Sequence, residues 1–408
     1  MLPLEEQLKV IRRGAEQIVP EDELRKKLER SIKTGKPLRV KYGIDPTGID
    51  VHLGHTVPLR KLHQFQELGH QAVLIIGNYT ALVGDPSGRD ETRAALTQEK
   101  VEANAKDYLL QVGKIVDIAK AEVRYNGEWF SRFTFLDVLG LTRQITVQRM
   151  LERDDFSKRY KAGEPIRLNE CLYPLMQGRD SVEINADIEL GGSEQLYNLM
   201  VGRDLQTDAR QEPQICITMP ILIGLDGTRR MGKSLGNYVG VGEPAQEQFD
   251  KIMSIPDNLM KLWFELLTDR PSAEVAALTN PQATHPKLAK QGLAKDILAF
   301  YHGADAAEKA CGEWERRFSG KQDPTEIAEV TVPLAETTNG KMMLTKLMTR
   351  AGLTASNGEA RRLIQQGGVT IGPDRTKATD PNIEIEVTDG LIIRVGSRKI
   401  VKIRVAGP

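Results

Sequence analysis

Residues 71–77 (QAVLIIG) are an apolar run with no polar residue between the opening glutamine and the closing glycine. Such a run is typical of a parallel β-strand buried on both faces, because a strand with one solvated face alternates polar and apolar side chains. Further strands are predicted over 38–44 and over 186–190, where the chain continues into two glycines. Strand, helix, strand and glycine-rich loop is the order of an α/β protein with a parallel sheet.

The segments around these strands complete the pattern. Residues 4–33 predict an amphipathic helix broken near Pro20, and the turn at 45–48 (DPTG) leads into a helix that contains His52 and His55. Further helices are predicted from Thr97 to about residue 119, over 169–180, and from Ser193. A strand-like segment is predicted at 221–223 (ILI).

A chain of 408 residues is too long for one compact core and suggests two or three domains. Helical patterning dominates after residue 234, with prolines at its boundaries, and residues 320–340 have the poorer pattern of a linker. We therefore predict a first domain over 1–229, a helical domain over 230–320, a linker over 321–340 and a small α+β domain over 341–408.

Charge is balanced over the whole chain, with 56 Lys and Arg against 56 Asp and Glu, but it is not evenly spread. Residues 341–408 contain 12 Lys and Arg and 6 Asp and Glu, a local excess of +6. A basic appendage of this kind favours nucleic-acid binding, and a solvated tail is the alternative.

The three cysteines, Cys171, Cys216 and Cys311, are scattered and form no CxxC pair. A disulfide framework or a zinc site is therefore not expected, and a reducing compartment fits. The first residues lack a basic segment followed by an apolar one, and no apolar run approaches membrane-spanning length. We expect a soluble, cytoplasmic protein.

Two short motifs lie far apart in the chain, HLGH at 52–55 and RMGKS at 230–234. Attack of a carboxylate on the α-phosphate of ATP builds negative charge on the phosphate oxygens and on the departing pyrophosphate. That charge can be met by a helix N-terminus, by histidine donors and by a lysine on a loop. The first motif alone is weak, since its histidines could be ordinary surface or capping residues, but the pair together indicates an adenylate-forming enzyme.

The two motifs resemble the HIGH and KMSKS signatures of the class I aminoacyl-tRNA synthetases. A third group narrows the substrate: Tyr173, Gln177 and Asp180 follow at i, i+4 and i+7, so on a helix they share one face. That face offers a phenol, an amide and a carboxylate, which suits a polar amino acid, although a solvated face is the alternative. With the segments DPSG at 85–88 and GGSEQ at 191–195, these residues resemble the tyrosyl-tRNA synthetase family.

This resemblance runs from about residue 38 to the end of the chain. It implies a Rossmann-like, doubly wound parallel-sheet catalytic domain with a dimer-forming insertion, then an α-helical anticodon-binding domain and an S4-like RNA-binding domain. It also implies a tyrosine–tRNA ligase that uses ATP with Mg²⁺, first to form tyrosyl-adenylate and then to charge the tRNA for tyrosine. Related enzymes are homodimers.

The resemblance also assigns site residues, and it assigns none to a metal. The implied catalytic residues are Thr47, His52, His55, Arg230, Lys233 and Ser234. The implied ATP-binding residues are Asp45, Gly54, Gly191, Gly192, Glu194 and Met231. The implied tyrosine-binding residues are Lys41, Gly43, Asp85, Tyr173, Gln177, Asp180 and Gln195.

Within that set the resemblance implies a division of labour. Asp85, Tyr173 and Gln177 grip the α-ammonium group of tyrosine, while Asp180 takes the phenolic hydroxyl. A buried carboxylate left unpaired by phenylalanine loses a hydrogen bond, and a site of this kind can reject the analogue by about 10⁴–10⁵.

At the other end of the substrate pair, Thr47 and His52 would meet the γ-phosphate, and Arg230 and Lys233 the pyrophosphate. His55 and the glycines at 191–192 would hold the ribose.

Residues 359–369 (EARRLIQQGGV) look like part of an S4-type RNA-binding module, which bacterial tyrosyl enzymes carry at the C-terminus. Arg361 and Arg362 on one helix would then contact RNA phosphates. A basic but purely structural subdomain is the alternative.

Several positions depart from the family pattern. Arg230 replaces the usual first lysine of the second motif, and Glu194 replaces the usual aspartate. Lys41 stands where many members have a tyrosine that helps to read the phenol, so that second partner must come from elsewhere or be absent. Arg179 could pair with Asp180 if it pointed inward.

Two other interpretations stay open at this point. A tryptophanyl enzyme would need a pocket that reads an indole N–H, and it would lack an S4-type tail. A synthetase-derived RNA-binding protein without catalysis would not need to keep His52, His55, Lys233, Asp85 and Gln177. Pyrophosphate exchange driven separately by tyrosine and by tryptophan would separate all three.

Overall fold

The computed structural model describes residues 1–47, 51–86, 97–320, 322–325, 327–396 and 399–406. They divide into two compact units, residues 1–307 and 308–408. Gly48 of the predicted turn, and Ser87 and Gly88 of the DPSG segment, lie outside the described residues. Within the described part of the chain, no helix combines the length and apolar character that a bilayer span requires.

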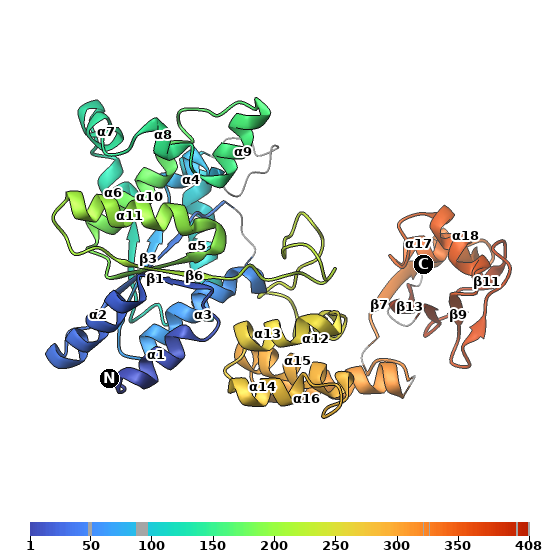
Figure 1. The fold of residues 1–408 in the computed structure, drawn as a ribbon. Helices are drawn as coiled ribbons and strands as arrows, with labels where there is room; N and C mark the ends of the chain where they lie inside the picture. Colours follow the sequence, from blue (N-terminus) through green and yellow to red (C-terminus); the bar gives the residue numbers. More distant parts are fainter. Residues whose placement is uncertain (48–50, 87–96, 321, 326, 397–398, 407–408) are drawn as a thin grey trace. The chain divides into compact units, whose positions relative to one another are not determined.

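The first unit contains a six-stranded sheet with the order β1-β6-β5-β2-β3-β4 (Figure 1). All neighbouring strands are parallel except β1, which pairs antiparallel with β6 at one edge. The strands are β1 (Gln17–Val19), β2 (Arg39–Ile44), β3 (Gln71–Ile76), β4 (Glu122–Tyr125), β5 (Ile188–Gly192) and β6 (Ile215–Met219). Five of the six residues of β3 are buried, so the predicted α/β class and the doubly buried strand are confirmed.

Helices cover both faces of this sheet. The helices α10 and α11 lie on one face, and α3 with the N-terminal α1 and α2 lies on the other (Figure 1). The helices before the sheet's last strand are α1 (Leu4–Arg12), α2 (Glu21–Thr34), α3 (Leu53–Glu67), α4 (Thr80–Val83), α5 (Gln98–Val112), α6 (Gly127–Phe130), α7 (Phe135–Thr142), α8 (Val147–Met150), α9 (Asp154–Ala162), α10 (Leu172–Glu183), the 3₁₀ turn η2 (Ser193–Gln195) and α11 (Leu196–Asp208).

The strand order locates a crevice. From β2 the chain proceeds through β3 and β4 to one side, whereas β5 and β6 lie on the other side. In open parallel sheets, ligands bind outside the carboxyl ends of the strands where the order reverses in this way. The carboxyl ends of β2 and β5 are therefore the expected place for a site.

A helical section completes the first unit: α12 (Ala245–Met253), η3 (Asp257–Leu259), α13 (Met260–Leu267), α14 (Ser272–Leu278), α15 (Pro286–His302) and the start of α16 (Ala304–Trp314). Trp263 of α13 is fully buried, and its indole nitrogen donates to the carbonyl of Ile223 at 3.1 Å. Arg60 of α3 pairs with Asp269 at 2.7 Å. These contacts tie the helical section to the sheet domain and to the loop that carries the second motif.

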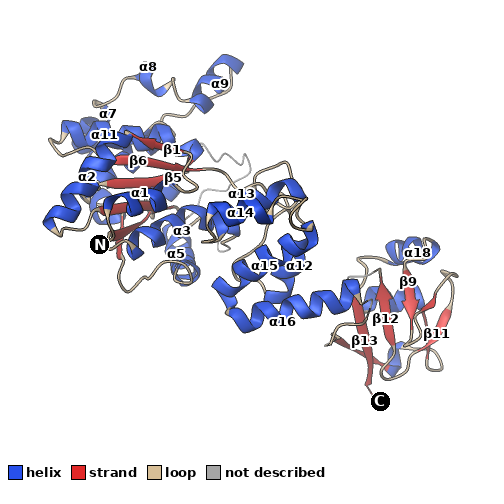
Figure 2. Cartoon of the chain, turned by 60° about the horizontal axis from the view of Figure 1, so that its bottom comes forward, coloured by secondary structure: helices blue, strands red, loops and turns tan. Residues whose placement is uncertain are grey.

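The second unit continues α16 into a turn of π-helix, η4 (Glu315–Ser319). It contains a five-stranded sheet with the order β10-β9-β12-β13-β7, the two-stranded β11-β8, and two helices, of which α18 lies at the outside of the unit (Figure 2). The elements are β7 (Glu329–Pro333), η5 (Leu334–Glu336), β8 (Lys341–Met343), α17 (Leu344–Arg350), α18 (Asn357–Gln365), β9 (Val369–Ile371), β10 (Thr376–Lys377), β11 (Glu384–Glu386), β12 (Ile392–Val395) and β13 (Lys399–Ala406). One apolar core, which includes Leu344, Leu347 and Ile403, holds them together.

Four local predictions need correction. The segment predicted as linker contains β7, which pairs in parallel with β13 and contributes the fully buried Val332 to the core, so residues 329–333 belong to the second unit's sheet. The predicted break near Pro20 contains β1, whose three residues gain their strand conformation only by pairing with β6.

The third correction concerns the strand before the second motif. The sheet strand is β6, and residues 221–223 lie beyond it, with Ile221 42% exposed. Pro220 interrupts the two segments, because proline has no N–H to donate to a ladder. Helix α5 also ends earlier than predicted, at Val112.

Candidate active site

A cavity of about 760 Å³ opens at the carboxyl ends of β2 and β5, the place that the strand order indicates. Its volume lies in the range of small-molecule sites. Every residue predicted for catalysis, ATP binding or tyrosine binding lines it, with the exception of Lys41. The cavity has two ends, one at the start of α3 and one under α10, and they differ in construction.

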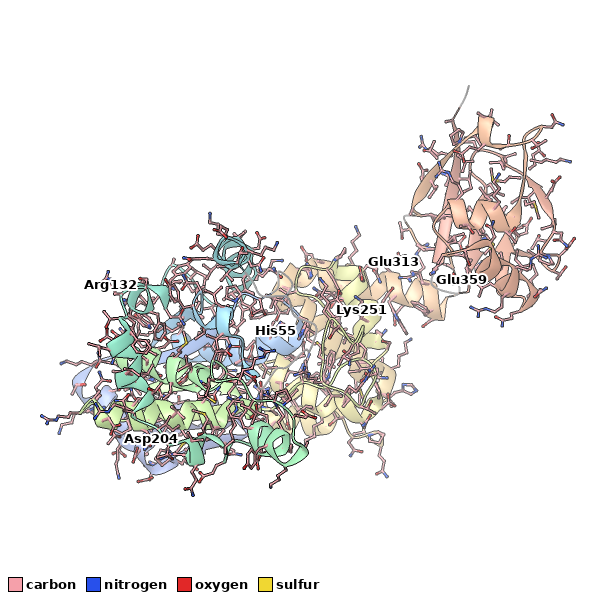
Figure 3. All side chains as sticks on the ribbon, turned by 90° about the horizontal axis from the view of Figure 1, so that it is seen from above. His55, Arg132, Asp204, Lys251, Glu313 and Glu359 are labelled. Atoms are coloured by element: carbon pink, nitrogen blue, oxygen red, sulfur yellow. The ribbon has the colours of Figure 1, made fainter. Side chains whose placement is uncertain are left out.

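The first motif lies at the N-terminus of α3. His52 is the N-cap residue, and its backbone N–H points to His55 Nδ1 at 3.4 Å. The two imidazoles stack with ring centroids 3.7 Å apart. In the side-chain view of Figure 3, the labelled His55 lies inside the first unit, whereas Arg132 and Asp204 lie at its periphery.

Burial lowers the pKa of His52 to about 3, and the surrounding protein also lowers the pKa of the cavity-facing His55. Both rings are therefore neutral at pH 7, each with one N–H to donate. Together with the positive end of α3, they form an environment for phosphate oxygens that adds no full charge.

The second motif lies beside the first. His52 forms an isolated bridge with Gly240, and Leu53 N donates to Val239 O at 2.9 Å. A Cβ added to Gly54 would lie only 3.5 Å from Met231 Cβ and 3.0 Å from the His52 ring. A side chain at position 54 would therefore press on the His52 ring, whereas its distance to Met231 is that of an ordinary contact.

Within the second motif, some residues anchor the loop and others face the cavity. Met231 is 5% exposed, and its N–H donates to Leu222 O at 2.8 Å. Asn237 accepts from Gly232 N at 2.9 Å and donates to Arg230 O at 3.1 Å. The side chains of Arg230, Lys233 and Ser234 are exposed toward the cavity.

At the other end, α10 is held to the sheet by Tyr173. Its hydroxyl donates to Asp45 Oδ2 at 2.8 Å, and Thr80 donates to the other oxygen of that carboxylate at 2.7 Å. A Cβ on Gly77 would collide with Asp45 at 2.0 Å, so the carboxylate occupies space that only glycine leaves free. Gly43 lies on β2, two residues after Lys41 and two before Asp45. A Cβ added to it would meet no atom within 4 Å, so open space remains beneath α10.

The next turn of α10 joins a polar network. The side-chain amide nitrogen of Asn198 donates to Gln177 Oε1 at 2.9 Å and to Gln195 Oε1 at 3.0 Å. Gln195 in turn donates to Asp85 Oδ2 at 2.6 Å. The buried Arg153 donates to Asn198 Oδ1 at 3.0 Å and to Asp85 Oδ1 at 3.3 Å. The predicted Asp85, Gln177 and Gln195 are thus oriented by two residues that the sequence did not single out.

Asp180 lies deepest and is 4% exposed. Trp129 Nε1 donates to its Oδ1 at 3.0 Å, and Asn126 Nδ2 to its Oδ2 at 3.4 Å. Burial raises the pKa of Asp180 to about 7, against the opposing effects of the nearby Lys41 cation and these two hydrogen bonds. The arrangement leaves a carboxylate facing the cavity with both oxygens fixed.

The residues that depart from the family pattern make different contacts in the structure. Arg179 does not pair with Asp180: its Nε donates to Glu183 at 2.8 Å, one helical turn along. The carboxylate of Glu194 folds back over Gly192, where an added Cβ would lie 2.4 Å from Glu194 Oε2.

Lys41 was predicted to bind tyrosine, but it does not line the cavity. Its side chain is 0% exposed and lies behind the cavity wall, where it pairs with Glu189 at 2.9 Å. Strand alternation directs residues 41, 43 and 45 toward the α10 face. Lys41 is two residues further from the carboxyl end than Gly43, so α10 covers it completely.

Sequence reasoning missed several residues around the cavity, and two of them follow a strand that it did not predict. Asn126 and Trp129 come directly after β4, and a site at the carboxyl ends of strands would have pointed to them had that strand been recognised. Tyr42 and Tyr108 also line the cavity. No sequence signal indicated Arg153 or Asn198.

The second unit presents Arg361 and Arg362 on the exposed face of α18, opposite the buried Ala360 and Ile364. Ser356 caps this helix, accepting from Glu359 N at 3.2 Å. Within the described residues of both units, no group of three or more His, Cys, Asp and Glu side chains could hold a metal ion.

Residues 33–319 match the family model described as class I tRNA synthetases (W and Y). The tyrosine–tRNA ligase of Symbiobacterium thermophilum is 49% identical over 401 residues, which covers 98% of this chain and 97% of that protein. The tyrosine–tRNA ligase of Geobacter metallireducens is also 49% identical over 401 residues, with 98% of each chain covered.

Solved structures give the same picture. A tyrosyl-tRNA synthetase from Archaeoglobus fulgidus, complexed with L-tyrosine, matches with a TM-score of 0.61 at 26% identity and covers 76% of this chain and 100% of its own. A C-terminally truncated mitochondrial tyrosyl-tRNA synthetase from Aspergillus nidulans matches with a TM-score of 0.62 at 22% identity over 78% of this chain and 95% of its own, which bears on the fold alone.

Proposed function

This chain belongs to the class I tRNA synthetase family of tryptophan and tyrosine enzymes, within which it is a tyrosine–tRNA ligase, and we propose that the cavity at the ends of β2 and β5 is its active site. The enzyme activates tyrosine with ATP and transfers it to tRNA. The observation that carries the site assignment is one cavity with a buried carboxylate at one end and paired histidines with an exposed lysine at the other.

For tyrosine binding, we propose that the substrate lies over Gly43, beneath α10. Its phenolic hydroxyl donates to Asp180, whose oxygens are already fixed by Trp129 and Asn126. Its ammonium group is held by the Asp85 carboxylate and by the side-chain oxygens of Tyr173 and Gln177. The preformed network supports this assignment, because the donors and acceptors are positioned before the substrate arrives.

In the first step, an oxygen of the tyrosine carboxylate forms a bond to the α-phosphorus of ATP, and the bond from that phosphorus to the bridging oxygen of pyrophosphate breaks. The carboxylate is already the nucleophile, so no general base is required. Catalysis then consists of positioning and charge stabilisation. The neutral His52 with the α3 N-terminus meets the phosphate oxygens, His55 holds the ribose, and Arg230 and Lys233 meet the leaving pyrophosphate. Thr47 and Ser234 add hydroxyl donors at the same end of the cavity.

In the second step, a hydroxyl oxygen of the terminal ribose of tRNA attacks the tyrosyl carbonyl carbon, the bond from that carbon to the phosphate oxygen of AMP breaks, and the hydroxyl proton passes to the departing AMP phosphate. We propose that Arg361 and Arg362 of the S4-like unit contact tRNA phosphates, which their exposure on α18 supports. The double variant Arg361→Ala with Arg362→Ala should then weaken tRNA charging, reduce its salt dependence and leave pyrophosphate exchange unchanged. Equal charging at matched salt would assign α18 a structural role only.

Mg²⁺ enters this scheme as part of the substrate Mg-ATP. Magnesium commonly binds through phosphate oxygens and waters with one or two carboxylates. A site with few protein ligands is compatible with the described residues, which offer no cluster of three.

We also propose a homodimer in the cytoplasm. The exposed apolar side chains of α7, Phe135 at 75%, Leu136 at 76% and Leu139 at 43%, support a contact with a second copy. Cys171 and Cys216 form no disulfide, which fits a reducing compartment. The proposed domains are 1–229, 230–320 and 341–408, with the last extended toward the N-terminus to include β7 at 329–333.

ATP–pyrophosphate exchange tests the function directly. Exchange that depends on tyrosine and not on tryptophan is expected, since Asp180 accepts from a phenol in a cavity whose walls are preformed. Exchange driven by tryptophan would favour the tryptophanyl alternative. An inactive protein that still binds tRNA would favour the alternative of a synthetase-derived RNA-binding protein.

A further inference from the structure

Lys41 has all its donors satisfied in a place that solvent does not reach. Its Nζ lies 2.9 Å from Glu189 Oε1 and donates to the carbonyl oxygen of Gln177 at 2.7 Å and to Ser181 Oγ at 2.8 Å. An ammonium group has three N–H donors, and each has an acceptor here. Two of these acceptors belong to α10 and one belongs to β5.

Glu189 is the cross-strand partner of Lys41, on the neighbouring parallel strand β5, and it is also 0% exposed. Its Oε1 accepts from Gln177 Nε2 at 3.0 Å, in addition to Lys41. Its Oε2 accepts from Ser181 Oγ at 3.0 Å and from Gln214. The Lys41–Glu189 pair therefore joins two central strands to both the main chain and the side chains of α10.

Stability alone gives a poor account of this pair. Removing two charges from water costs about as much as their attraction contributes, and apolar residues of the same volume often serve as well. The location is more informative. Gln177 lies three residues before Asp180 and Ser181 lies one residue after it, so the pair contacts the turn of α10 that carries two of the tyrosine-binding side chains.

We propose that Lys41 is a positioning residue for tyrosine recognition: with Glu189 it fixes the turn of α10 that carries Gln177 and Asp180, and it supplies the buried cation that keeps Asp180 available as an anionic acceptor. The inference rests on the proposed function of the cavity and assigns a role to a residue that does not touch the substrate. It also answers how this chain reads a phenol without a tyrosine at position 41.

The groups around Asp180 make the charge balance explicit. The charged and titratable groups are Lys41 from β2, Glu189 from β5 and Tyr173 from α10, and the uncharged donors are Trp129 of α6 and its N-cap residue Asn126. The Lys41 cation lowers the pKa of Asp180, and the Glu189 carboxylate raises it. Removing one or the other partner should therefore move the ionisation of Asp180 in opposite directions.

This opposition gives the test. Lys41→Met and Glu189→Gln would be compared with the full-length enzyme in tyrosine-dependent ATP–pyrophosphate exchange from about pH 6 to about pH 8.5. The pH at which kcat/KM for tyrosine reaches half its maximum should rise in Lys41→Met and fall in Glu189→Gln. A displacement of one pKa unit changes the ionised fraction by up to about tenfold on the acidic side, and the KM for ATP should stay unchanged. General damage to the fold would not produce shifts of opposite sign.

Lys27 offers a matched control. It is 1% exposed and pairs with Asp187 at 3.4 Å and with Glu212 at 3.9 Å, and neither partner belongs to α10. Lys27→Met removes an equally buried cation, so it should reduce thermal stability without moving the pH profile or the KM for tyrosine.

Lys41→Met leaves Glu189 unpaired and could prevent folding. The double variant Lys41→Met with Glu189→Gln leaves neither charge behind, and it should fold with a KM for tyrosine raised about tenfold while the KM for ATP is unchanged. A double variant with the wild-type KM for tyrosine and the wild-type preference over phenylalanine would overturn the inference. So would single variants with unshifted profiles. A wild-type protein without tyrosine-dependent exchange would instead overturn the proposed function itself.

Discussion

The two ends of the cavity bind different groups, and they differ in the exposure and the charge of the residues that form them. At the phosphate end, Arg230, Lys233 and Ser234 are exposed on a loop, and the histidines beside them are neutral. At the phenol end, Asp180 is 4% exposed and its two oxygens are fixed by hydrogen bonds from Trp129 and Asn126. An exposed cation needs little support, whereas a buried carboxylate must be satisfied by its neighbours. Rate should therefore depend on single residues at the first end, and specificity on a network at the second.

The strongest test of this difference is Asp180→Asn. The amide can still accept a hydrogen bond but loses the charge, and its NH₂ group opposes the donors Trp129 and Asn126. We expect the ratio of kcat/KM for tyrosine to that for phenylalanine to fall about 10²- to 10³-fold, out of the roughly 10⁴–10⁵ that a site of this kind can reach. Pyrophosphate exchange with each amino acid measures it. An unchanged ratio would mean that another group reads the phenol.

At the phosphate end, Lys233→Ala and His52→Ala should each lower kcat for adenylate formation by about 10²-fold, as for removal of an oxyanion donor. Their contacts form mainly with developing charge, so the affinity for tyrosine should change little. Single-turnover kinetics separates the two quantities. If either variant raised the KM for tyrosine as strongly as Asp180→Asn does, the two ends would not be independent.

The difference between the ends also explains what the sequence could and could not predict. Residues of the phosphate end lie in two contiguous motifs, and the α10 triad has helical spacing, so both were recognisable. The network behind Asp180 is assembled from β2, β5 and the segment after β4, which are far apart in the chain. Its members carry no motif, and β4 was not predicted at all.

Lys41 was misplaced for a related reason. Alternation along β2 gives its face but not its depth, and only the position of α10 over the strand decides that the side chain is covered. The linker prediction failed in the same way, because β7 is a strand only through its pairing with the distant β13.

Trp129→Phe tests the phenol end of the cavity again, and its expected effect is smaller than that of the variants above. The phenyl ring keeps the apolar contacts with Phe130, Val73 and Ile75, but it cannot donate to Asp180. The loss of one hydrogen bond to a charged group corresponds to about tenfold in affinity. We expect kcat/KM for tyrosine to fall by that factor, with kcat at saturating tyrosine almost unchanged. The matched variant Phe130→Leu alters the same apolar cluster without touching the carboxylate, and it should leave the preference for tyrosine over phenylalanine as it is.

The smallest effect needs no mutation, because the two ends should respond differently to pH. The pKa of Asp180 is raised to about 7, so its carboxylate forms as pH rises through neutrality, and tyrosine binding should strengthen in that direction. Between pH 6.5 and 7.5 the ionised fraction of a group with that pKa rises about threefold, and the KM for tyrosine should fall by a similar factor. The pKa of His52 is lowered to about 3, and that of His55 is also lowered, so both remain neutral across this interval and the KM for ATP should be flat. In Asp180→Asn the pH dependence for tyrosine should disappear while the wild-type behaviour toward ATP is retained. A KM for ATP that follows pH as steeply as the KM for tyrosine would show that the titrating group is shared, and the division of the cavity into two independent ends would then fail.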